Sequence, residues 1–173
     1  MTIIAYADPP YVGQAKRHYN SDEVDHVKLI AELVKYDGYA LSCSTTSLRH
    51  LLPLFPNEAR VAAWVKPFAF FHSGSRGHPP YAWEPVIFCS ARPTKKSPKG
   101  VRDWLSCNAF GVTPAERAYG KSVGVVGIKP PAFYLWLFSI LGCEPQDKFL
   151  DMFPGSGMGS RTWKQWCKDL TKV

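Results

Sequence analysis

The hydrophobic and polar positions alternate between short apolar runs and helical repeats. Residues 2–7, "TIIAYA", form an apolar run of β type, and Val24, Val27, Ile30, Ala31 and Val34 then recur at helical spacing. We therefore predict a strand over 2–7, a helix over 21–36 that begins at Ser21, and a second strand in "YALSCS" after the Asp37-Gly38 turn.

The pattern continues in the same manner to residue 91. We predict a helix over 47–54, closed by Pro56, and strands in "ARVAAWVK" (59–66) and "AWEPVIFCSA" (82–91). Alternation of strands and helices is typical of an α/β fold with a mostly parallel sheet.

The rest of the chain, residues 92–173, has a basic part and a patterned part. Residues 92–122 are basic and show little periodicity, so no element is predicted there. A helix is expected over 131–141, with Pro130-Pro131 suited to its first turn. The stretch 148–170 then predicts a strand, a glycine-rich turn and a helix that begins near Ser160.

Composition limits the class of protein. A chain of 173 residues, 46% hydrophobic and 14% aromatic, is long enough for one sizeable core and is not typical of a disordered chain. We predict a single domain over 1–173, divided into a catalytic half (1–91), a basic substrate-contact segment (92–122) and a half that carries the cofactor loop (123–173).

The cysteines and the N-terminus indicate the compartment. The five cysteines contain no C-x-x-C pair, which predicts neither a disulfide framework nor a metal site. No signal peptide is expected, because Asp8 and two prolines interrupt the first apolar run. Lys129 and Pro130-Pro131 also interrupt the apolar run 123–142, so no membrane span is expected. We predict a soluble cytoplasmic protein.

The net charge of +7 is unevenly placed. Between Arg92 and Lys121 the chain carries seven lysines and arginines against two acidic residues. Such a segment either contacts the phosphates of a nucleic acid or forms a solvated basic loop. The candidates for phosphate contact here are Lys95, Lys96, Lys99 and Arg102.

Two turns carry the candidate chemistry. "DPPY", Asp8 to Tyr11, follows the first predicted strand. "DMFPGSG", Asp151 to Gly157, follows the last, and its glycines would let the backbone approach a ligand at the start of a helix. By itself the glycine turn is a weak signal, because it lacks the spacing of a dinucleotide site and the lysine of a P-loop.

Together the two turns resemble the catalytic and cofactor motifs of the DNA amino-methyltransferases that use S-adenosylmethionine. The order of the motifs, catalytic first and cofactor last, is similar to the circularly permuted β type of that family, in the D-P-P-Y version associated with the N6 amine of adenine. The resemblance extends over nearly the whole chain. It implies a Rossmann-like sheet, mostly parallel with one antiparallel strand, permuted and truncated after the cofactor-loop helix.

The resemblance also implies roles for individual residues. The catalytic turn would comprise Asp8, Pro9, Pro10 and Tyr11, with Asp8 and the Pro9 carbonyl accepting the amine hydrogens and Tyr11 stacking on a flipped base. The residues implied for S-adenosylmethionine are Asp8, Lys129, Asp151, Phe153, Gly155, Ser156 and Gly157. Phe153 could instead fill the core, and Lys129 could be a solvated lysine at a helix start.

Further basic residues are candidates for contact with the nucleic-acid backbone. Lys16 and Arg17 follow the catalytic turn, and Arg76 lies in the loop "HSGSRGHPP"; surface solubility is the alternative for all three. DNA is the expected substrate, while RNA and the N4 amine of cytosine stay open.

One departure from the family leaves an alternative. No strand is expected after the last helix, so strand 148–152 would lie at or near a sheet edge, where a second copy or a partner subunit could complete the sheet. A module that binds nucleic acid or a partner without turnover is therefore the alternative to an active enzyme.

Overall fold

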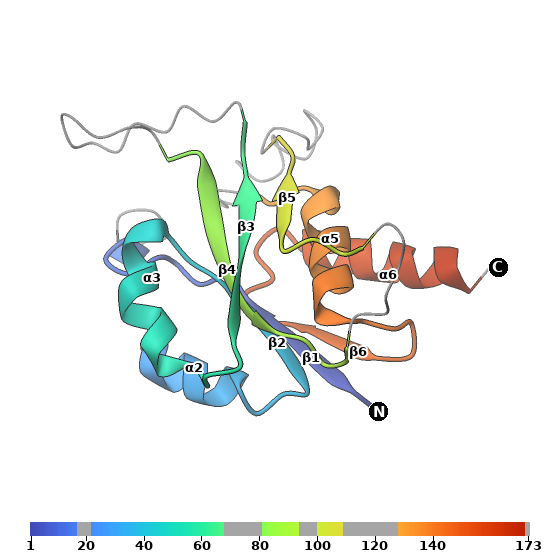
Figure 1. The fold of residues 1–173 in the computed structure, drawn as a ribbon, viewed down its shortest axis with the longest axis horizontal. Helices are drawn as coiled ribbons and strands as arrows, with labels where there is room; N and C mark the ends of the chain where they lie inside the picture. The colour runs from blue at the N-terminus through green and yellow to red at the C-terminus, as the bar shows by residue number, and fades with distance from the viewer. Residues whose placement is uncertain (17–21, 68–80, 94–99, 109–127, 172–173) are drawn as a thin grey trace.

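The computed structural model describes residues 1–16, 22–67, 81–93, 100–108 and 128–171. The strands of this part of the chain form one six-stranded sheet, with helices packed on its two faces (Figure 1). The elements are, in chain order, β1 (Ile3–Ala7), α2 (His26–Leu33), β2 (Gly38–Ser42), α3 (Thr45–Leu51), the 3-10 turn η1 (Leu52–Leu54), β3 (Arg60–Val65), β4 (Trp83–Cys89), β5 (Trp104–Ser106), α5 (Pro131–Leu141), β6 (Lys148–Asp151) and α6 (Met158–Leu170).

The sheet has the order β5-β3-β4-β2-β1-β6. β1 pairs in parallel with β2 and β6, β3 pairs in parallel with β5, and β4 runs antiparallel to both β2 and β3. The mixed sheet with a single reversed strand confirms the predicted fold class. β6 lies at one edge of the described sheet, as expected for a strand whose following helix leads to no further strand.

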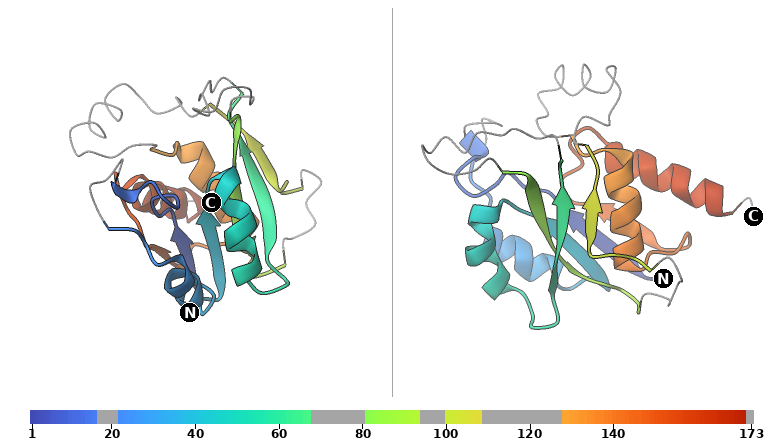
Figure 2. Two further views of the ribbon diagram at one scale, coloured as in Figure 1. Left: turned by 90° about the vertical axis from the view of Figure 1, so that its left-hand side faces the viewer. Right: turned by 45° about the horizontal axis from the view of Figure 1, so that its top comes forward.

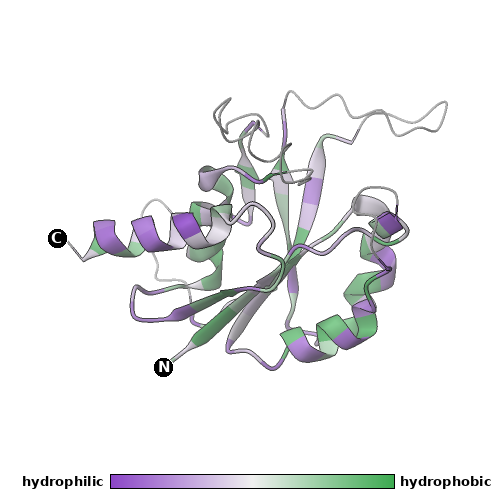
Figure 3. Cartoon of the chain, turned by 180° about the vertical axis from the view of Figure 1, so that it is seen from behind, coloured by the Kyte–Doolittle hydropathy of each residue, from purple (hydrophilic) through white to green (hydrophobic). Residues whose placement is uncertain are grey.

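Helices cover both faces of the sheet (Figure 2), and each face has its own core. On one face α5 packs with Ile4, Tyr6 and Trp64 of the sheet, and α6 lies against α5. On the other face α2 and α3 cover Ala5, Leu41 and other strand residues. α5 is apolar on most sides because it lies between the sheet and α6, whereas α6 presents a polar outer face (Figure 3).

The predicted start of the first helix is wrong. α2 begins at His26, and Asp25 caps it by accepting a hydrogen bond from the Lys28 amide at 3.1 Å. Residues 22–25 are not helical. The Glu23 carboxylate instead accepts the backbone amides of Gly13 and Ala15, each at 3.1 Å, so this stretch supports the turn that follows β1.

Other parts of the prediction also differ from the structure. A helix was expected over 47–54, whereas α3 covers Thr45–Leu51 and the 3-10 turn η1 covers Leu52–Leu54. β5 was not predicted, because its three residues are too few to show alternation. α6 begins at Met158, two residues before the expected start, since Gly157 takes a left-handed conformation (φ +72°) that lets the helix follow the glycine turn directly.

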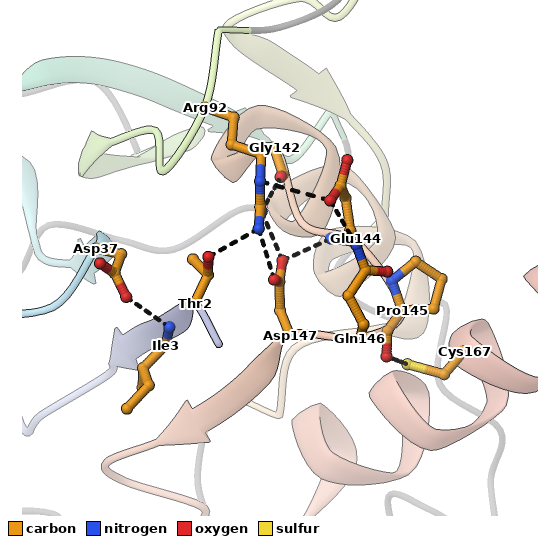
Figure 4. A network of polar contacts seen from close by, with 10 residues as sticks. All are labelled: Thr2, Ile3, Asp37, Arg92, Gly142, Glu144, Pro145, Gln146, Asp147 and Cys167. Atoms are coloured by element: carbon orange, nitrogen blue, oxygen red, sulfur yellow. Dashed lines mark hydrogen bonds and ion pairs between the residues drawn. The ribbon is translucent and has the colours of Figure 1, made fainter.

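An ion-pair network closes the end of the sheet opposite the two turns (Figure 4). The Arg92 guanidinium donates to both oxygens of Asp147 at 2.7 Å, and to Thr2 Oγ1 at 2.8 Å. Bidentate pairing of this kind is geometrically specific. It ties the segment after β4 to the N-terminus and to the start of β6. Arg92, which was counted with the basic segment, therefore holds the fold together.

Candidate active site

The two turns meet at one end of the sheet. β1 and β6 are adjacent and parallel, with Tyr6 opposite Asp151 in the register. The chain leaves β1 into the Asp8 turn and leaves β6 into the glycine turn, although some 140 residues separate them in the sequence. The carboxyl ends of adjacent parallel strands are where ligands bind in open α/β sheets.

The Asp8 turn is held by backbone contacts. The carbonyl of Tyr11 accepts the Gln14 amide at 2.8 Å. The amide of Gly13, whose φ is +76°, is one of the two that bind Glu23. Pro9 is buried, while Asp8 and Tyr11 are partly exposed. The turn is thus fixed on its inner side and open on the side that carries its two functional side chains.

A lysine contacts the Asp8 carboxylate directly. Lys129 Nζ lies 2.5 Å from Asp8 Oδ2 and 3.7 Å from Glu84 Oε2. Lys66 Nζ in turn pairs with Glu84 Oε1. We call these four residues (Asp8, Lys66, Glu84 and Lys129) the ionic cluster. Its two positive and two negative side chains come from four separate segments of the chain.

The ionic cluster is largely removed from water. The side chains of Lys129, Lys66, Glu84 and Asp8 are 3%, 9%, 18% and 26% exposed. Asp8 is thus the member that solvent or a ligand reaches most easily. Charges this buried persist only when they are paired, so each lysine needs its carboxylate.

Burial shifts the pKa values of the cluster in different directions. Burial raises the pKa of Asp8 above its ordinary value, although the Lys129 ammonium opposes this. Burial also acts to raise the pKa of Glu84, but the Lys129 and Lys66 ammoniums outweigh it and the net shift is downward. Burial lowers the pKa of Lys66. The pKa values of the two carboxylates are therefore shifted in opposite directions, that of Asp8 upward and that of Glu84 downward.

The base of the glycine turn carries a second aspartate. Asp151 Oδ1 accepts the Phe153 amide at 3.3 Å, and Oδ2 is buried with no hydrogen-bond partner among the described residues. Burial raises the pKa of Asp151 to about 6. A buried acceptor without a donor is costly, so this oxygen is suited to a donor from a ligand.

The glycines shape the turn beside Asp151. Gly155 and Gly157 have positive φ angles of 46° and 72°. A Cβ added at Gly159 would lie 2.5 Å from Asp151 Oδ2 and 2.9 Å from Tyr134 Cε1. The 13-residue helix α6 begins at Met158, so its free amides open next to this carboxylate. The turn can hold a ligand that carries both a donor and a negative group.

The structure brings together most of the residues expected at the cofactor site. Phe153 packs against the core beside α2 and α3, and the Ser156 carbonyl accepts Arg161 at 3.3 Å. Lys129 lies on Asp8, and its positive charge also acts to lower the pKa of Asp151, so it lies within electrostatic reach of both aspartates.

The expected nucleic-acid contacts are only partly described. Lys16 is exposed just after the Asp8 turn. Arg102 is exposed beside β5, with its guanidinium 5.5 Å from the ring centre of Trp104. Arg17, Arg76, Lys95, Lys96 and Lys99 lie outside the described residues.

Sequence reasoning missed Lys66 and Glu84. Each is a charged residue at the end of an apolar strand, "AWVK" and "WEP", and that position was the available signal. Within the described residues no group of three or more His, Cys, Asp or Glu could hold a metal ion. No described helix is long and apolar enough to cross a membrane.

Comparisons with known proteins identify the fold. No protein-family model matches the sequence, and no curated protein matches it significantly. Solved structures do match. The PvuII DNA methyltransferase (cytosine-N4-specific) superposes with a TM-score of 0.68 at 15% identity, over 95% of this chain and 71% of that one.

Two structures of a second protein match over the same share of this chain. M1.HpyAVI in complex with SAM has a TM-score of 0.57 at 17% identity, over 95% of this chain and 78% of that one. M1.HpyAVI has a TM-score of 0.58 at 16% identity, covering 95% and 75%. At these identities the likeness establishes the fold.

Proposed function

We propose that the chain is an S-adenosylmethionine-dependent methyltransferase that modifies the exocyclic N6 amine of adenine in DNA. The observation that carries this proposal is the adjacency of Asp8 and Asp151 at the ends of paired strands β1 and β6. One turn offers a carboxylate beside a tyrosine, and the other offers a glycine cradle at a helix N-terminus. The fold shared with proteins named as a DNA methyltransferase and as a SAM complex supports it.

The glycine turn fits S-adenosylmethionine chemically. That molecule carries an ammonium and a carboxylate at one end and ribose hydroxyls in its middle. Asp151 Oδ2, buried without a donor among the described residues, would accept from an ammonium or a hydroxyl. The free amides at the start of α6 would favour a negative group, and Gly157, where an added Cβ would meet nothing within 4 Å, leaves space for close approach. When bound, the cofactor supplies an electrophilic methyl group.

Asp8 and Pro9 would act on the target amine. The lone pair of an exocyclic amine is delocalised into the base, so the nitrogen is a weak nucleophile. The Asp8 carboxylate and the Pro9 carbonyl would accept its two hydrogens, which localises the lone pair and stabilises the positive charge that develops on nitrogen. Proline fixes φ at this turn, so the carbonyl needs little reorganisation.

Tyr11 would hold the base. A target base must leave the duplex to reach a turn at the sheet end, and stacking on an aromatic ring offsets about 1–3 kcal/mol of that cost. Burial, followed by the negative charges of Glu84 and Asp8, raises the pKa of the Tyr11 hydroxyl. Tyr11 is therefore a neutral ring beside the carboxylate that receives the amine.

Labelled-methyl transfer tests the proposal. Duplex DNA, single-stranded DNA and RNA are offered with labelled S-adenosylmethionine, and the nucleosides are then separated. We expect N6-methyladenine in DNA. N4-methylcytosine would move the assignment to the amine named for the PvuII enzyme, and label only in RNA would change the substrate class.

The variant Asp8→Ala should fold and lose about 10²–10³ in the rate of transfer, the usual effect of removing one such electrostatic contact. Asp169→Ala, at an exposed position of α6, is the control and should keep the wild-type rate. A wild-type rate in Asp8→Ala would refute the catalytic role.

One observation favours a second candidate, a binding module without turnover. The Lys129 ammonium lies on Asp8 Oδ2, which is an oxygen that the amine would need. Calorimetry with S-adenosylmethionine and S-adenosylhomocysteine separates the candidates, because absence of binding at millimolar ligand would favour the module. We further propose that the β6 edge pairs with a second copy or a partner subunit, and sedimentation of the purified chain tests whether it self-associates.

A further inference from the structure

The ionic cluster has an internal order that the proposed chemistry does not explain. Lys129 lies between two carboxylates, closer to Asp8 (2.5 Å) than to Glu84 (3.7 Å). Glu84 is also paired with Lys66, on its other oxygen. The chain of contacts therefore runs Lys66, Glu84, Lys129, Asp8, and Asp8 is the only member that belongs to the catalytic turn.

The strands fix Lys66 and Glu84 firmly. Glu84 lies opposite Trp64 in the β3–β4 register, and the Lys66 amide donates to the Ala82 carbonyl at 2.7 Å. Both residues stand next to the last paired positions of their strands. Their side chains are thus presented by rigid elements, which position groups more accurately than loops do.

Trp64 forms a common base for the two ammoniums. Lys66 Nζ lies 4.4 Å and Lys129 Nζ 5.9 Å from the ring centre of Trp64. The indole is itself anchored, because its Nε1 donates to the Cys107 carbonyl at 3.3 Å. An aromatic face attracts a cation at these distances. The ring therefore restricts the positions that the two ammonium groups can take between the carboxylates of Asp8 and Glu84.

We propose that Lys66 and Glu84 are positioning residues for methyl transfer, which set how tightly the Lys129 ammonium is held on Asp8. This inference rests on the proposed function, in which Asp8 accepts the amine. Lys66 satisfies much of the Glu84 charge, so Glu84 attracts Lys129 only partially. Lys129 is then shared between the two carboxylates. It lies close enough to Asp8 to keep that carboxylate charged, yet is bound weakly enough for the substrate amine to displace it.

The two positioning residues should act in opposite directions. In Lys66→Met, Glu84 loses its own partner and draws Lys129 away, so the pKa of Asp8 rises. In Glu84→Gln, the Lys129 ammonium no longer divides its charge between Glu84 and Asp8, and a neighbouring negative charge is gone, so the pKa of Asp8 falls. In the double variant the pKa of Asp8 should lie between those of the two single variants, because the Lys66 ammonium also acts on Asp8 directly.

Other groups around Asp8 do not predict this pattern. Tyr6, Tyr134 and Asp151 also interact electrostatically with Asp8, but each variant leaves them in place. The Tyr11 hydroxyl hydrogen-bonds to Glu84, and the glutamine oxygen of Glu84→Gln can still accept from it. A role limited to stability would lower the melting temperature of both variants and would not move the pKa of Asp8 in opposite directions.

Two measurements test the inference. The first is the single-turnover rate against pH, in which the acid limb should move up by about one pH unit in Lys66→Met and down in Glu84→Gln. The KM for S-adenosylmethionine should stay near that of the wild type. The second is carboxyl ¹³C NMR of the aspartates in the free protein, which reads the Asp8 titration without any activity.

Controls separate the possible failures. Glu32→Gln breaks the exposed Lys35–Glu32 pair and should change neither readout. If the wild type transfers no methyl group, the proposed function fails and the NMR titration still tests the cluster. Asp8 titrations that shift in the same direction in both single variants, or in neither, overturn the inference. If Glu84→Gln does not fold, the Lys66→Met titration alone decides, and an unchanged or lowered Asp8 pKa overturns it.

Discussion

Replacing Asp151 with asparagine should make the protein more stable at neutral pH while removing its cofactor binding. The Asp151 carboxylate is partly buried, and burial raises its pKa from 3.8 to about 6. A raised pKa means that the folded state holds the proton more tightly than the unfolded chain does. Stability from this group is therefore complete below about pH 4 and is lost as the pH rises through about 6.

The size of the effect follows from the shift. About two pKa units correspond to about 3 kcal/mol of destabilisation at pH 8 in the wild type. Asparagine removes the charge, and its oxygen can still accept the Phe153 amide. Its NH₂ group would replace an oxygen that has no hydrogen-bond partner among the described residues, which costs about 1 kcal/mol. The net gain in Asp151→Asn at pH 8 is about 2 kcal/mol.

Urea unfolding between pH 4.5 and 8 measures the difference. The stability of Asp151→Asn minus that of the wild type should rise by about 2–3 kcal/mol across this range, with most of the change below pH 7. Asp169→Asn, an exposed aspartate of α6, is the matched control and should track the wild type. A difference that does not depend on pH, or a variant less stable than the wild type at pH 8, would refute the reasoning.

Adding ligand completes the test. Ligand at 100 times its dissociation constant should stabilise the wild type by about 2.7 kcal/mol. The same concentration of S-adenosylmethionine should leave Asp151→Asn nearly unchanged, because the ligand has lost the charged acceptor. Equal stabilisation of both proteins would show that Asp151 does not contact the cofactor.

Two further predictions concern the surroundings of the site. Gly159→Ala should reduce S-adenosylmethionine affinity and lower stability by about 1–3 kcal/mol, since its Cβ would lie 2.5 Å from Asp151 Oδ2. The exposed neighbour variant Ser160→Ala should change neither quantity. Calorimetry measures the affinity and urea unfolding the stability, and wild-type affinity in Gly159→Ala would contradict the prediction. Charge reversal at Lys95, Lys96, Lys99 and Arg102 should make the plot of log binding constant for DNA against log salt concentration less steep, by roughly 0.9 per lost duplex contact. Arg49→Glu on α3 is the control. An unchanged slope would mean that the basic segment is solvated and does not contact phosphates.

The sequence predicted the sheet well because its strands are local apolar runs. The helix over 131–141 was correct at both ends, since Pro131 suits its first turn and Gly142 closes it at φ +67°. The predicted start of α2 was wrong because the acidic residues that precede the helix have different roles. Asp25 caps the helix, whereas Glu23 accepts the backbone amides of residues eight and ten positions earlier. Such a contact has no local signature.

The ionic cluster was only half predictable. Asp8 and Lys129 belong to motifs that can be quoted from the sequence, whereas Lys66 and Glu84 have no motif. They meet because the β3–β4 register sets Trp64 opposite Glu84, which places Glu84 on the face where Lys129 arrives from the start of α5. Register depends on pairing between strands that lie about 20 residues apart, so it follows from the assembled sheet.

The two aspartates at the strand ends differ in how their charge is balanced, and this difference supports separate roles for them. Burial raises the pKa of both, and the Asp8 carboxylate also acts to raise that of Asp151. Asp8 has the Lys129 ammonium in contact, which keeps it ionised and gives it a group that substrate can displace. Asp151 has one backbone amide on Oδ1 and, within the described residues, no hydrogen-bond donor on Oδ2. The protein therefore bears the cost of the Asp151 charge until a ligand brings a donor. That is the arrangement expected when one carboxylate takes part in the reaction and its neighbour waits for a cofactor.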